Sequence, residues 1–377
     1  MSEKRDDSRL EVIVLTGGPC AGKTTALSII PDYFEKLGWR VITIPEEATN
    51  VILSGFRLDD CSNPIVFQKL VTGGHLNRLL WYQDYVASAG LDKVLIVCDR
   101  GACDNKAYIG QNLFEQVLES LMFSEAGVHG LYGAVFHLVT AADGAEEFYT
   151  LGNNAARSEP PEQARELDLA TQNAWVGHPH LRIIKNDGSF EDKMKHLLGE
   201  ISSFLGEPKP YEIERKFLID YPDIEQLRKM PNCQEVEILQ TYLKSNPGEE
   251  VRVRQRGIGE NYTFTKTIKQ MTPDPAKRIE VERKIDEKEY LQALMQAEPY
   301  CTAIRKTRFC ILQRDSGQYL EVDIYPSSHD TAILEIEIPD VDANIVFPDF
   351  LNVRFEVTGN PLYSNYGIAK NGGRLPR

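Results

Sequence analysis

The chain has 377 residues, of which 42% are hydrophobic and 26% are charged, and its formal net charge is −14. This length favours two domains, and the acidic balance argues against a protein that binds nucleic acid in bulk. No apolar run predicts a transmembrane segment, and no signal peptide or lipidation motif is visible, which favours a cytoplasmic protein. The seven cysteines form no C-x-x-C pair and indicate neither a disulfide framework nor a zinc site.

Short apolar runs alternate with helical patterns in the first half of the chain. The predicted buried strands are residues 12–15, 39–44, 94–98, 134–139 and 181–184. The clearest predicted helices are residues 23–37, 64–88 and 190–205. Such an alternation predicts an α/β domain, residues 1–206, in which a parallel sheet is covered by helices on both faces. The proline-containing segment 205–210 is typical of a linker.

The first predicted strand ends in a glycine loop that fits the P-loop pattern G-x-x-x-x-G-K-[ST]. Glycines let the backbone N–H groups of such a loop wrap closely around phosphate oxygens. We expect Lys23 to reach the β- and γ-phosphates of a nucleotide and the Thr24 hydroxyl to bind Mg²⁺. The predicted nucleotide-binding residues are Gly17, Gly18, Pro19, Cys20, Ala21, Gly22, Lys23, Thr24 and Thr25.

Polar residues at other strand ends are candidate partners of this loop. Asp99 ends a buried strand, where a carboxylate can hold Mg²⁺ through water, although it can also cap the next helix. Arg100 can pair with Asp99 or contact a phosphate. Glu46 and Glu47 end a neighbouring strand, where one of them is a candidate general base or hydroxyl acceptor and a solvated turn is the alternative. Arg157 is either a lid arginine that stabilises developing charge or a surface side chain.

Several segments of residues 10–206 together resemble the NadR-type P-loop ATPase family. They are residues 17–25, Pro45-Glu46-Glu47-Ala48-Thr49, Asp99-Arg100-Gly101, Asn153, Arg157-Ser158-Glu159, Leu167-Asp168, Trp175 and His178-Pro179. The resemblance implies a small-molecule-kinase fold that takes ATP or GTP, with Arg157 as the lid arginine and Glu46 near the phosphate acceptor. Thr49 stands where the family commonly has an arginine.

After residue 210 the hydrophobic period changes from that of a helix to two. Val251 and Val253 alternate with Arg252 and Arg254, and similar alternation with acidic residues recurs at 279–282, 320–324 and 334–338. The pattern predicts a mainly antiparallel β domain, residues 207–377, in which every strand has one charged face.

The charges of this domain are segregated by strand, with arginines in one strand and paired carboxylates in others. An open sheet with a solvated face is one interpretation. A closed β-barrel of about eight strands is the other, because its interior has room for a small ligand. Lysines and arginines inside such a barrel would bind a polyphosphate or another phosphorylated small molecule, and carboxylates would hold Mg²⁺ or Mn²⁺.

The segment Glu212-x-Glu214-x-Lys216 opens a series of motifs over residues 210–370 that resembles the CYTH, or triphosphate tunnel metalloenzyme, family. The resemblance implies metal ligation by Glu212, Glu214, Glu321, Asp323, Glu335 and Glu337. It implies phosphate binding by Lys216, Arg252, Arg254, Lys269, Lys306 and Arg308. Lys266 is an alternative to Lys269, and Glu280 and Glu282 are further candidate acids.

These features predict a P-loop phosphotransferase or NTPase fused to a metal-dependent tunnel domain that binds or hydrolyses a triphosphate. The order of the two halves also resembles the TRPL translocation defect protein 14 family. That resemblance implies an alternative function, a non-enzymatic regulator of trafficking that binds GTP and a phospholipid headgroup and is peripheral to membranes.

Overall fold

The computed structural model describes residues 9–57, 63–149, 160–207, 211–212, 214–246, 248–259, 261–271, 278–313, 316–338 and 345–376. The chain divides into two compact units, Met1–Ile201 and Ser202–Arg377. Each unit has its own sheet.

The first unit is built on a five-stranded parallel sheet with strand order β2-β3-β1-β4-β5. Its strands are β1 (Leu10–Thr16), β2 (Arg40–Ile44), β3 (Val94–Asp99), β4 (Ala134–Leu138) and β5 (Leu181–Ile184). The strands β1, β3 and β4 are apolar along nearly their whole length and buried on both faces, as expected when helices cover both sides of a parallel sheet. The sequence prediction of a parallel α/β sheet is therefore confirmed.

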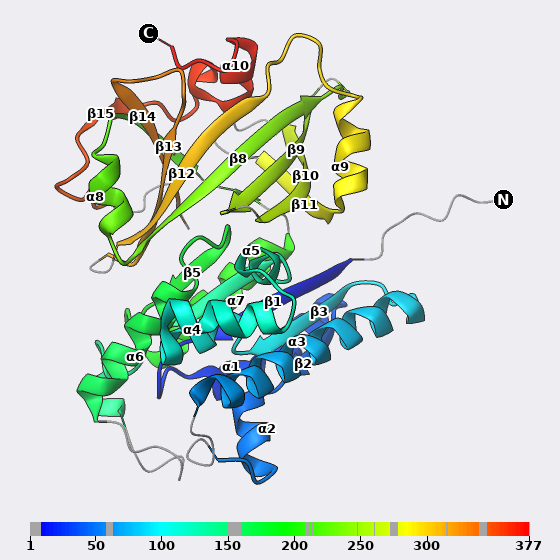
Figure 1. Ribbon diagram of the computed structural model, residues 1–377, viewed down its shortest axis with the longest axis vertical. Coiled ribbons are helices and arrows are strands. Elements are labelled where there is room, and N and C mark those ends of the chain that lie inside the picture. The colour runs from blue at the N-terminus through cyan, green and yellow to red at the C-terminus, as the bar shows by residue number, and fades with distance from the viewer. Residues whose placement is uncertain are drawn as a thin grey trace. The chain divides into compact units, whose positions relative to one another are not determined.

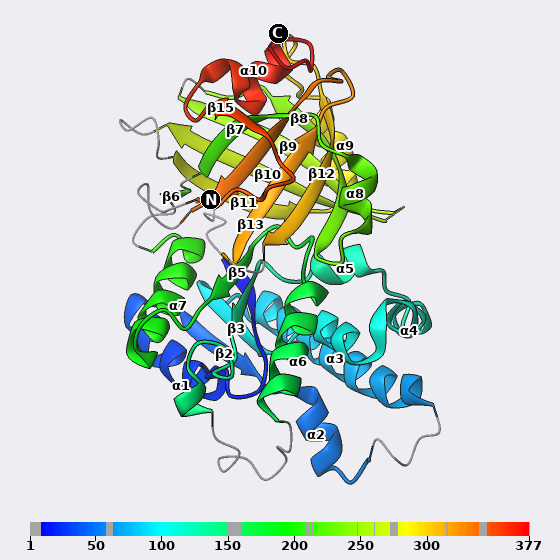
Figure 2. The same ribbon diagram turned by 90° about the vertical axis from the view of Figure 1, so that its left-hand side faces the viewer.

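Helices connect these strands in chain order. They are α1 (Lys23–Phe34), η1 (Glu35–Leu37), α2 (Glu47–Leu53), α3 (Pro64–Ala89), η3 (Ala102–Asn105), α4 (Lys106–Ser120), α5 (Glu125–His129), η4 (Glu146–Phe148), α6 (Pro161–Ala174) and α7 (Phe190–Leu205). Figure 2 shows α1 and α7 on one side of the sheet and α3, α4 and α6 on the other. The long helix α3 begins at Pro64 because the Asn63 side chain caps the Ile65 N–H, and Gly90 in the left-handed region ends it.

The second unit contains a sheet of ten described strands, and each ladder between them is antiparallel. The order is β15-β7-β14-β13-β12-β8-β9-β10-β11-β6. The strands are β6 (Tyr211–Glu212), β7 (Glu214–Asp220), β8 (Cys233–Leu243), β9 (Glu249–Ile258), β10 (Asn261–Met271), β11 (Arg278–Ile285), β12 (Ile304–Gln313), β13 (Gln318–Ile324), β14 (Thr331–Glu337) and β15 (Val353–Glu356).

Strands β6 and β7 follow each other in the chain with only residue 213 between them, yet they pair with different parts of the sheet. Strand β6 pairs with β11, whereas β7 pairs with β14 and β15. One short segment therefore meets both ends of the strand series that runs from β14 to β11, and this sheet is strongly curled (Figure 1).

The apolar residues of the two-residue period lie on the outer face of this curled sheet. Phe217, Phe309, Val322 and Leu334 are buried there together with Leu227 of helix α8 (Ile224–Lys229). Helix α9 (Glu287–Leu294) covers the outer face near β9 and β10, whereas η5 (Pro361–Tyr363) and α10 (Asn365–Lys370) lie near the C-terminus. Burial of each such large side chain contributes roughly 1.5–3 kcal/mol. The opposite face carries the charged residues, together with a second buried apolar cluster that includes Leu218, Tyr242 and Ile333.

Candidate functional sites

The P-loop follows β1 directly and requires glycine at two positions. Gly17 has a φ of 140°, and a Cβ there would lie 2.1 Å from the Leu138 carbonyl oxygen of β4. Gly22 has a φ of 94° and forms the N-cap of α1. A side chain at either position would strain the loop. The glycine spacing seen in the sequence thus follows from the close approach of β1, β4 and α1.

Lys23 lies over the loop rather than pointing away from it. Its Nζ donates hydrogen bonds to the carbonyl oxygens of Gly17 (2.8 Å) and Gly18 (3.0 Å). Burial, assisted by the positive charge of Arg100, lowers the pKa of Lys23 to about 8. Phosphate oxygens that enter the loop would offer this ammonium negatively charged partners in place of two neutral carbonyls.

Asp99 ends β3 beside the P-loop strand, with Leu15 of β1 as its register partner. Its Oδ1 is buried and forms no hydrogen bond within the part of the chain that the structure describes. Burial raises the pKa of this carboxyl group. The Thr24 hydroxyl belongs to an exposed residue at the start of α1. Two oxygen donors of this kind, one of them unpartnered, fit a Mg²⁺ ion at the P-loop.

Glu46 follows β2 and forms an ion pair with Arg100, whose Nε lies 2.6 Å from Glu46 Oε1. Thr49 donates a second hydrogen bond to Glu46 (2.7 Å). Burial alone would raise the pKa of Glu46, but the positive charge of Arg100 and the hydrogen bond from Thr49 bring it below its usual value. Arg100 therefore pairs with Glu46 rather than with Asp99. The neighbouring Glu47 pairs with Arg78 of α3 at 3.0 Å.

Two further residues bear on the site of the first unit, Arg157 and Asp104. The predicted lid arginine, Arg157, lies outside the residues that the structure describes. Asp104 has no distinguishing sequence pattern beyond its nearness to Asp99. It is buried and accepts hydrogen bonds from Gly101 N (2.6 Å), Trp175 Nε1 (3.3 Å) and the Thr16 hydroxyl. It thereby fixes the end of β1 from which the P-loop starts.

Nucleotide affinity of the first unit should fall as the pH rises through about 8, the pKa of Lys23. The reason is that the phosphates are bound by the protonated amine, so binding takes up a proton once the free amine is neutral. The measurement is nucleotide affinity as a function of pH. A Lys23→Arg variant is the control, because arginine stays charged and its profile should lack the part of this step that comes from residue 23. An affinity of the wild type that is constant across this pH range would contradict the prediction.

In the second unit the strand registers place the charged residues on one face. Arg252 and Arg254 of β9 lie opposite Thr267 and Thr265 of β10. Lys269 is buried and lies on the same face of β10 as these threonines, whereas Lys266 lies on the opposite face. Lys269 is therefore the lysine of β10 that shares the charged face. Arg256, which the sequence analysis did not single out, is buried on this face as well.

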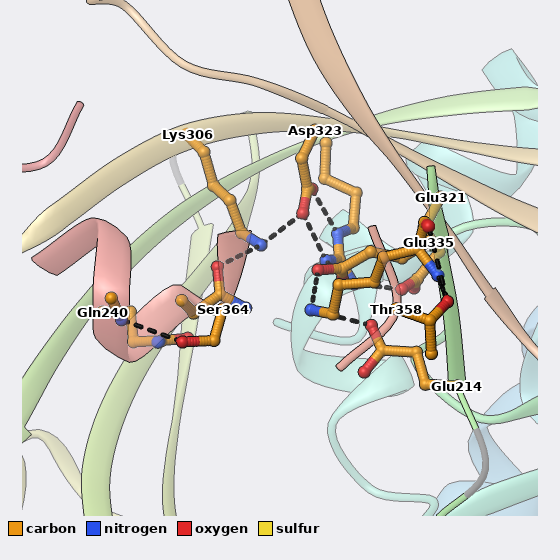
Figure 3. Close-up of polar contacts among 12 residues, drawn as sticks. Glu214, Gln240, Lys306, Glu321, Asp323, Glu335, Thr358 and Ser364 are labelled. Atoms are coloured by element: carbon orange, nitrogen blue, oxygen red, sulfur yellow. Dashed lines mark hydrogen bonds and ion pairs between the residues drawn. The ribbon is translucent and has the colours of Figure 1, made fainter. Parts of the chain in front are cut away.

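The acidic residues of β13 and β14 lie on the same inner face of the curled sheet, beside basic residues of β12 and β7. Arg308 of β12 is the register partner of Asp323 in β13, and Glu321 of β13 is the partner of Glu335 in β14. Lys216 of β7 in turn lies opposite Glu335. Figure 3 shows the side chains of Glu214, Glu321, Asp323, Glu335 and Lys306 gathered in one polar cluster.

Arg308 is the centre of this cluster. Its guanidinium donates to both carboxylate oxygens of Asp323, at 2.6 and 2.7 Å, and to one oxygen each of Glu321 and Glu335. Burial disfavours its charge, but the three carboxylates outweigh that effect and raise its pKa further. One arginine thus forms ion pairs with three of the acids that the sequence predicts as metal ligands.

Two lysines complete the pairing. Lys306 is 1% exposed and donates to Asp323, which is 0% exposed, and burial together with the charge of Arg308 lowers the pKa of Lys306 to about 8. Lys216 Nζ lies 2.5 Å from Glu335 and 3.0 Å from Glu214. Because these partners are so close, the pKa of Lys216 is raised despite its burial.

The remaining predicted tunnel residues take less central positions. Glu337 is the register partner of Glu214. Arg254 approaches Glu282 of β11 at 3.9 Å, and Thr267 donates to the same carboxylate. The side chains of Glu212 and Glu280 lie outside the description. Among the described residues, no group of three or more His, Cys, Asp or Glu side chains is arranged to hold a metal ion. The acids of the cluster do not form a metal site while Arg308 is hydrogen-bonded to them.

A comparison with protein-family sequence models found a match to the family described as AAA domain over residues 12–193. Residues 12–193 are therefore similar to a P-loop-type AAA domain. The match contains the glycine loop, Asp99 and the end of β4. A comparison with curated proteins found no match.

Solved structures similar to this chain include the inorganic triphosphatase NE1496, with 27% sequence identity and a TM-score of 0.30 over 42% of this chain and 94% of that one. A second structure of NE1496, described as a hypothetical protein, matches with 27% identity and a TM-score of 0.30 over 44% and 99% of the two chains. The PH1819 protein from Pyrococcus horikoshii OT3 matches with 20% identity and a TM-score of 0.28 over 35% and 81%. None of these comparisons supports a role in phospholipid binding. Within the described residues, no helix has the length and apolarity needed to cross a membrane.

Proposed function

We propose that the first unit binds a nucleoside triphosphate with Mg²⁺ and acts as a phosphotransferase or NTPase. The P-loop with Lys23 would bind the phosphates, and Thr24 and Asp99 would hold the ion, which supplies charge neutralisation when bound. Glu46 has a lowered pKa and is paired with Arg100, so it is a weak base. Its proposed role is therefore to orient the hydroxyl of the phosphate acceptor. Arg157 is the proposed lid residue.

For the second unit we propose binding, and metal-dependent hydrolysis, of a triphosphate or a related phosphorylated ligand inside a closed tunnel. The observation that carries this proposal is the concentration of buried cations on one sheet face. The buried cations are Arg252, Lys269, Lys306 and Arg308, and the half-buried Lys216 and Arg254 lie beside them. Buried cations would bind phosphate oxygens more strongly than solvated ones, because the surrounding dielectric is lower.

The short segment 211–220 supports the closed form of the tunnel, because it pairs with β11 through β6 and with β14 through β7. Carboxylates at 212, 214, 321, 323, 335 and 337 are oxygen donors of the type that Mg²⁺ and Mn²⁺ prefer. Their ligation of a metal remains a prediction, with Glu321, Asp323 and Glu335 needing to exchange Arg308 for the ion.

The test is calorimetric titration of tripolyphosphate, with and without Mn²⁺, into the full chain carrying Lys23→Ala so that the P-loop does not contribute. Replacing Arg252 and Arg254 together by alanine should weaken tripolyphosphate binding by about tenfold or more, because each substitution removes a charged hydrogen-bond donor. The matched control is Arg283→Ala, because Arg283 is an exposed arginine of β11.

Phosphate release measured under the same conditions then separates binding from hydrolysis. Absence of tripolyphosphate binding, or binding that is equal in the double variant and the control, would overturn the proposal for this unit. Metal-independent binding without phosphate release would limit the unit to a ligand-binding role.

A further inference from the structure

The outer side of the P-loop is held by residues that are distant in the sequence. Thr140 Oγ1 donates to the Pro19 carbonyl oxygen (2.5 Å), and Ala141 N donates to the Cys20 carbonyl oxygen (3.3 Å). In a planar trans peptide the C=O and the following N–H point in opposite directions. Turning these carbonyls outward therefore turns the next N–H groups of the loop towards its inner, phosphate-binding side.

Lys193 of α7 binds the next carbonyl of the loop, that of Ala21, which follows Pro19 and Cys20. Its Nζ donates to the carbonyl oxygens of Ala21 (3.0 Å) and Val139 (2.6 Å) and to Asn186 Oδ1 (2.8 Å). All three N–H donors of the ammonium are used, and the residue is 3% exposed. Its burial lowers its pKa to about 8, although the charge of Asp168 acts in the opposite direction. A charged donor at the Ala21 carbonyl also polarises that peptide, so the Gly22 N–H becomes a stronger donor to phosphate.

Asp168 of α6 holds the other end of the loop. Its Oδ1 accepts hydrogen bonds from Gly18 N (2.7 Å) and Thr140 N (3.1 Å), and Gln172 donates to its Oδ2 (3.0 Å). The residue is 2% exposed, and His137 Nε2 lies 3.1 Å from the same Oδ1. A Cβ on Gly18 would lie 2.7 Å from this carboxylate, so the approach also explains why residue 18 is glycine.

We propose that Lys193 and Asp168 are positioning residues of the P-loop, which fix its backbone before a nucleotide arrives. Asp168 holds the N–H of Gly18 away from the phosphate side, and Lys193 holds the carbonyl of Ala21 outward. Both also bind residues just after β4, Thr140 and Val139, so the loop and the strand end are fixed to each other. This inference rests on the proposed binding of a nucleoside triphosphate at the loop.

The test compares Lys193→Met with Lys195→Met in the full chain. Lys195 lies on the same helix but its side chain is 67% exposed, which makes it a matched control. Lys193→Met should lower the affinity for ATP and GTP with Mg²⁺ by about tenfold to a hundredfold, the effect of losing hydrogen bonds from a charged group. A Lys23→Ala variant measures the background, which is any binding of ATP or GTP that does not take place at the P-loop.

Amide hydrogen exchange measured without nucleotide separates positioning from general destabilisation. Exchange in peptides that cover residues 17–24 should become at least about tenfold faster in Lys193→Met, while peptides from β3 should exchange as in the wild type. Asp168→Asn, with exposed Glu166→Gln as its control, should give the same local effect. Lys193→Gln, which keeps an N–H donor but removes the charge, is the milder variant for the case that Lys193→Met does not fold.

The outcomes distinguish the two proposals. If the wild type binds no nucleotide, the proposed function of the first unit is wrong, and the exchange data alone then decide the role of Lys193 and Asp168. Unchanged exchange in the loop overturns the inference, as does exchange that rises equally in β3. Nucleotide affinity in Lys193→Met equal to that of Lys195→Met also overturns it.

Discussion

Lys23→Ala should abolish measurable nucleotide binding by the first unit. The substitution removes the only lysine side chain of the glycine loop, an ammonium that lies on the Gly17 and Gly18 carbonyls and would contact the β- and γ-phosphates. Truncating one member of such a charge pair costs about 2–5 kcal/mol, or more than about thirtyfold in affinity. The measurement is calorimetric titration of ATP and GTP with Mg²⁺.

Lys36→Ala is the matched control, because Lys36 is an exposed residue of η1 at the far end of the α1 segment. It should bind nucleotide as the wild type does. Both variants should unfold at a similar temperature, since the loop lysine bonds only two carbonyls. Unchanged affinity in a folded Lys23→Ala variant would remove the P-loop assignment, together with the proposed role of Thr24 and Asp99.

Arg308→Met should destabilise the second unit by about 3–5 kcal/mol at neutral pH, because it leaves buried carboxylates without their main counter-charge. Glu321, Asp323 and Glu335 all lose a hydrogen bond to the guanidinium. The measurement is denaturant unfolding followed by a probe in this unit. Arg305→Met is the control, because Arg305 is an exposed residue of the same strand with opposite parity, and its loss should change stability by only a few tenths of a kcal/mol.

The pH dependence of this effect has a definite sign. In the wild type the cations lower the pKa of Glu335 well below its usual value, although burial acts against them, so stability is lost as the pH falls through that lowered pKa. In Arg308→Met the carboxylates are buried with less compensation, and their pKa values should rise above those of the unfolded chain. The difference in the free energy of unfolding between the wild type and Arg308→Met should therefore become smaller as the pH falls. A difference that is constant with pH would show that lost packing, rather than unpaired charge, causes the instability.

The fold was predictable from the sequence where the signal is local. The glycine loop and the apolar strands around it depend on spacing within a few residues, and the five-stranded parallel sheet follows from their alternation with helices. The charged faces of the second unit were also visible, because a period of two places Arg252 and Arg254 on one side of a strand. The closure of the tunnel and the roles of the individual charged residues remain predictions.

What the sequence could not provide was the pairing of side chains across strands. The sequence predicts phosphate binding by Arg308 and metal ligation by Asp323, and the register of β12 and β13 makes the two residues partners in this structure. Lys193 was missed for a related reason. In sequence it resembles Lys195, and only its spacing of four and eight residues from the buried Leu197 and Ile201 indicates the inner face of α7.

The saturation of the cationic cluster in the second unit has a consequence for ligand selectivity. Lys216, Lys306 and Arg308 already have carboxylate partners, so an incoming anion has to compete with charges held at contact distance. We expect a chloride ion or a single phosphate, which brings little charge to one place, to compete poorly with these carboxylates. A chain of linked phosphates presents several negative groups at once and loses translational freedom only once. If the cluster binds a polyphosphate as proposed, these carboxylates would favour the binding of polyanions over that of small anions.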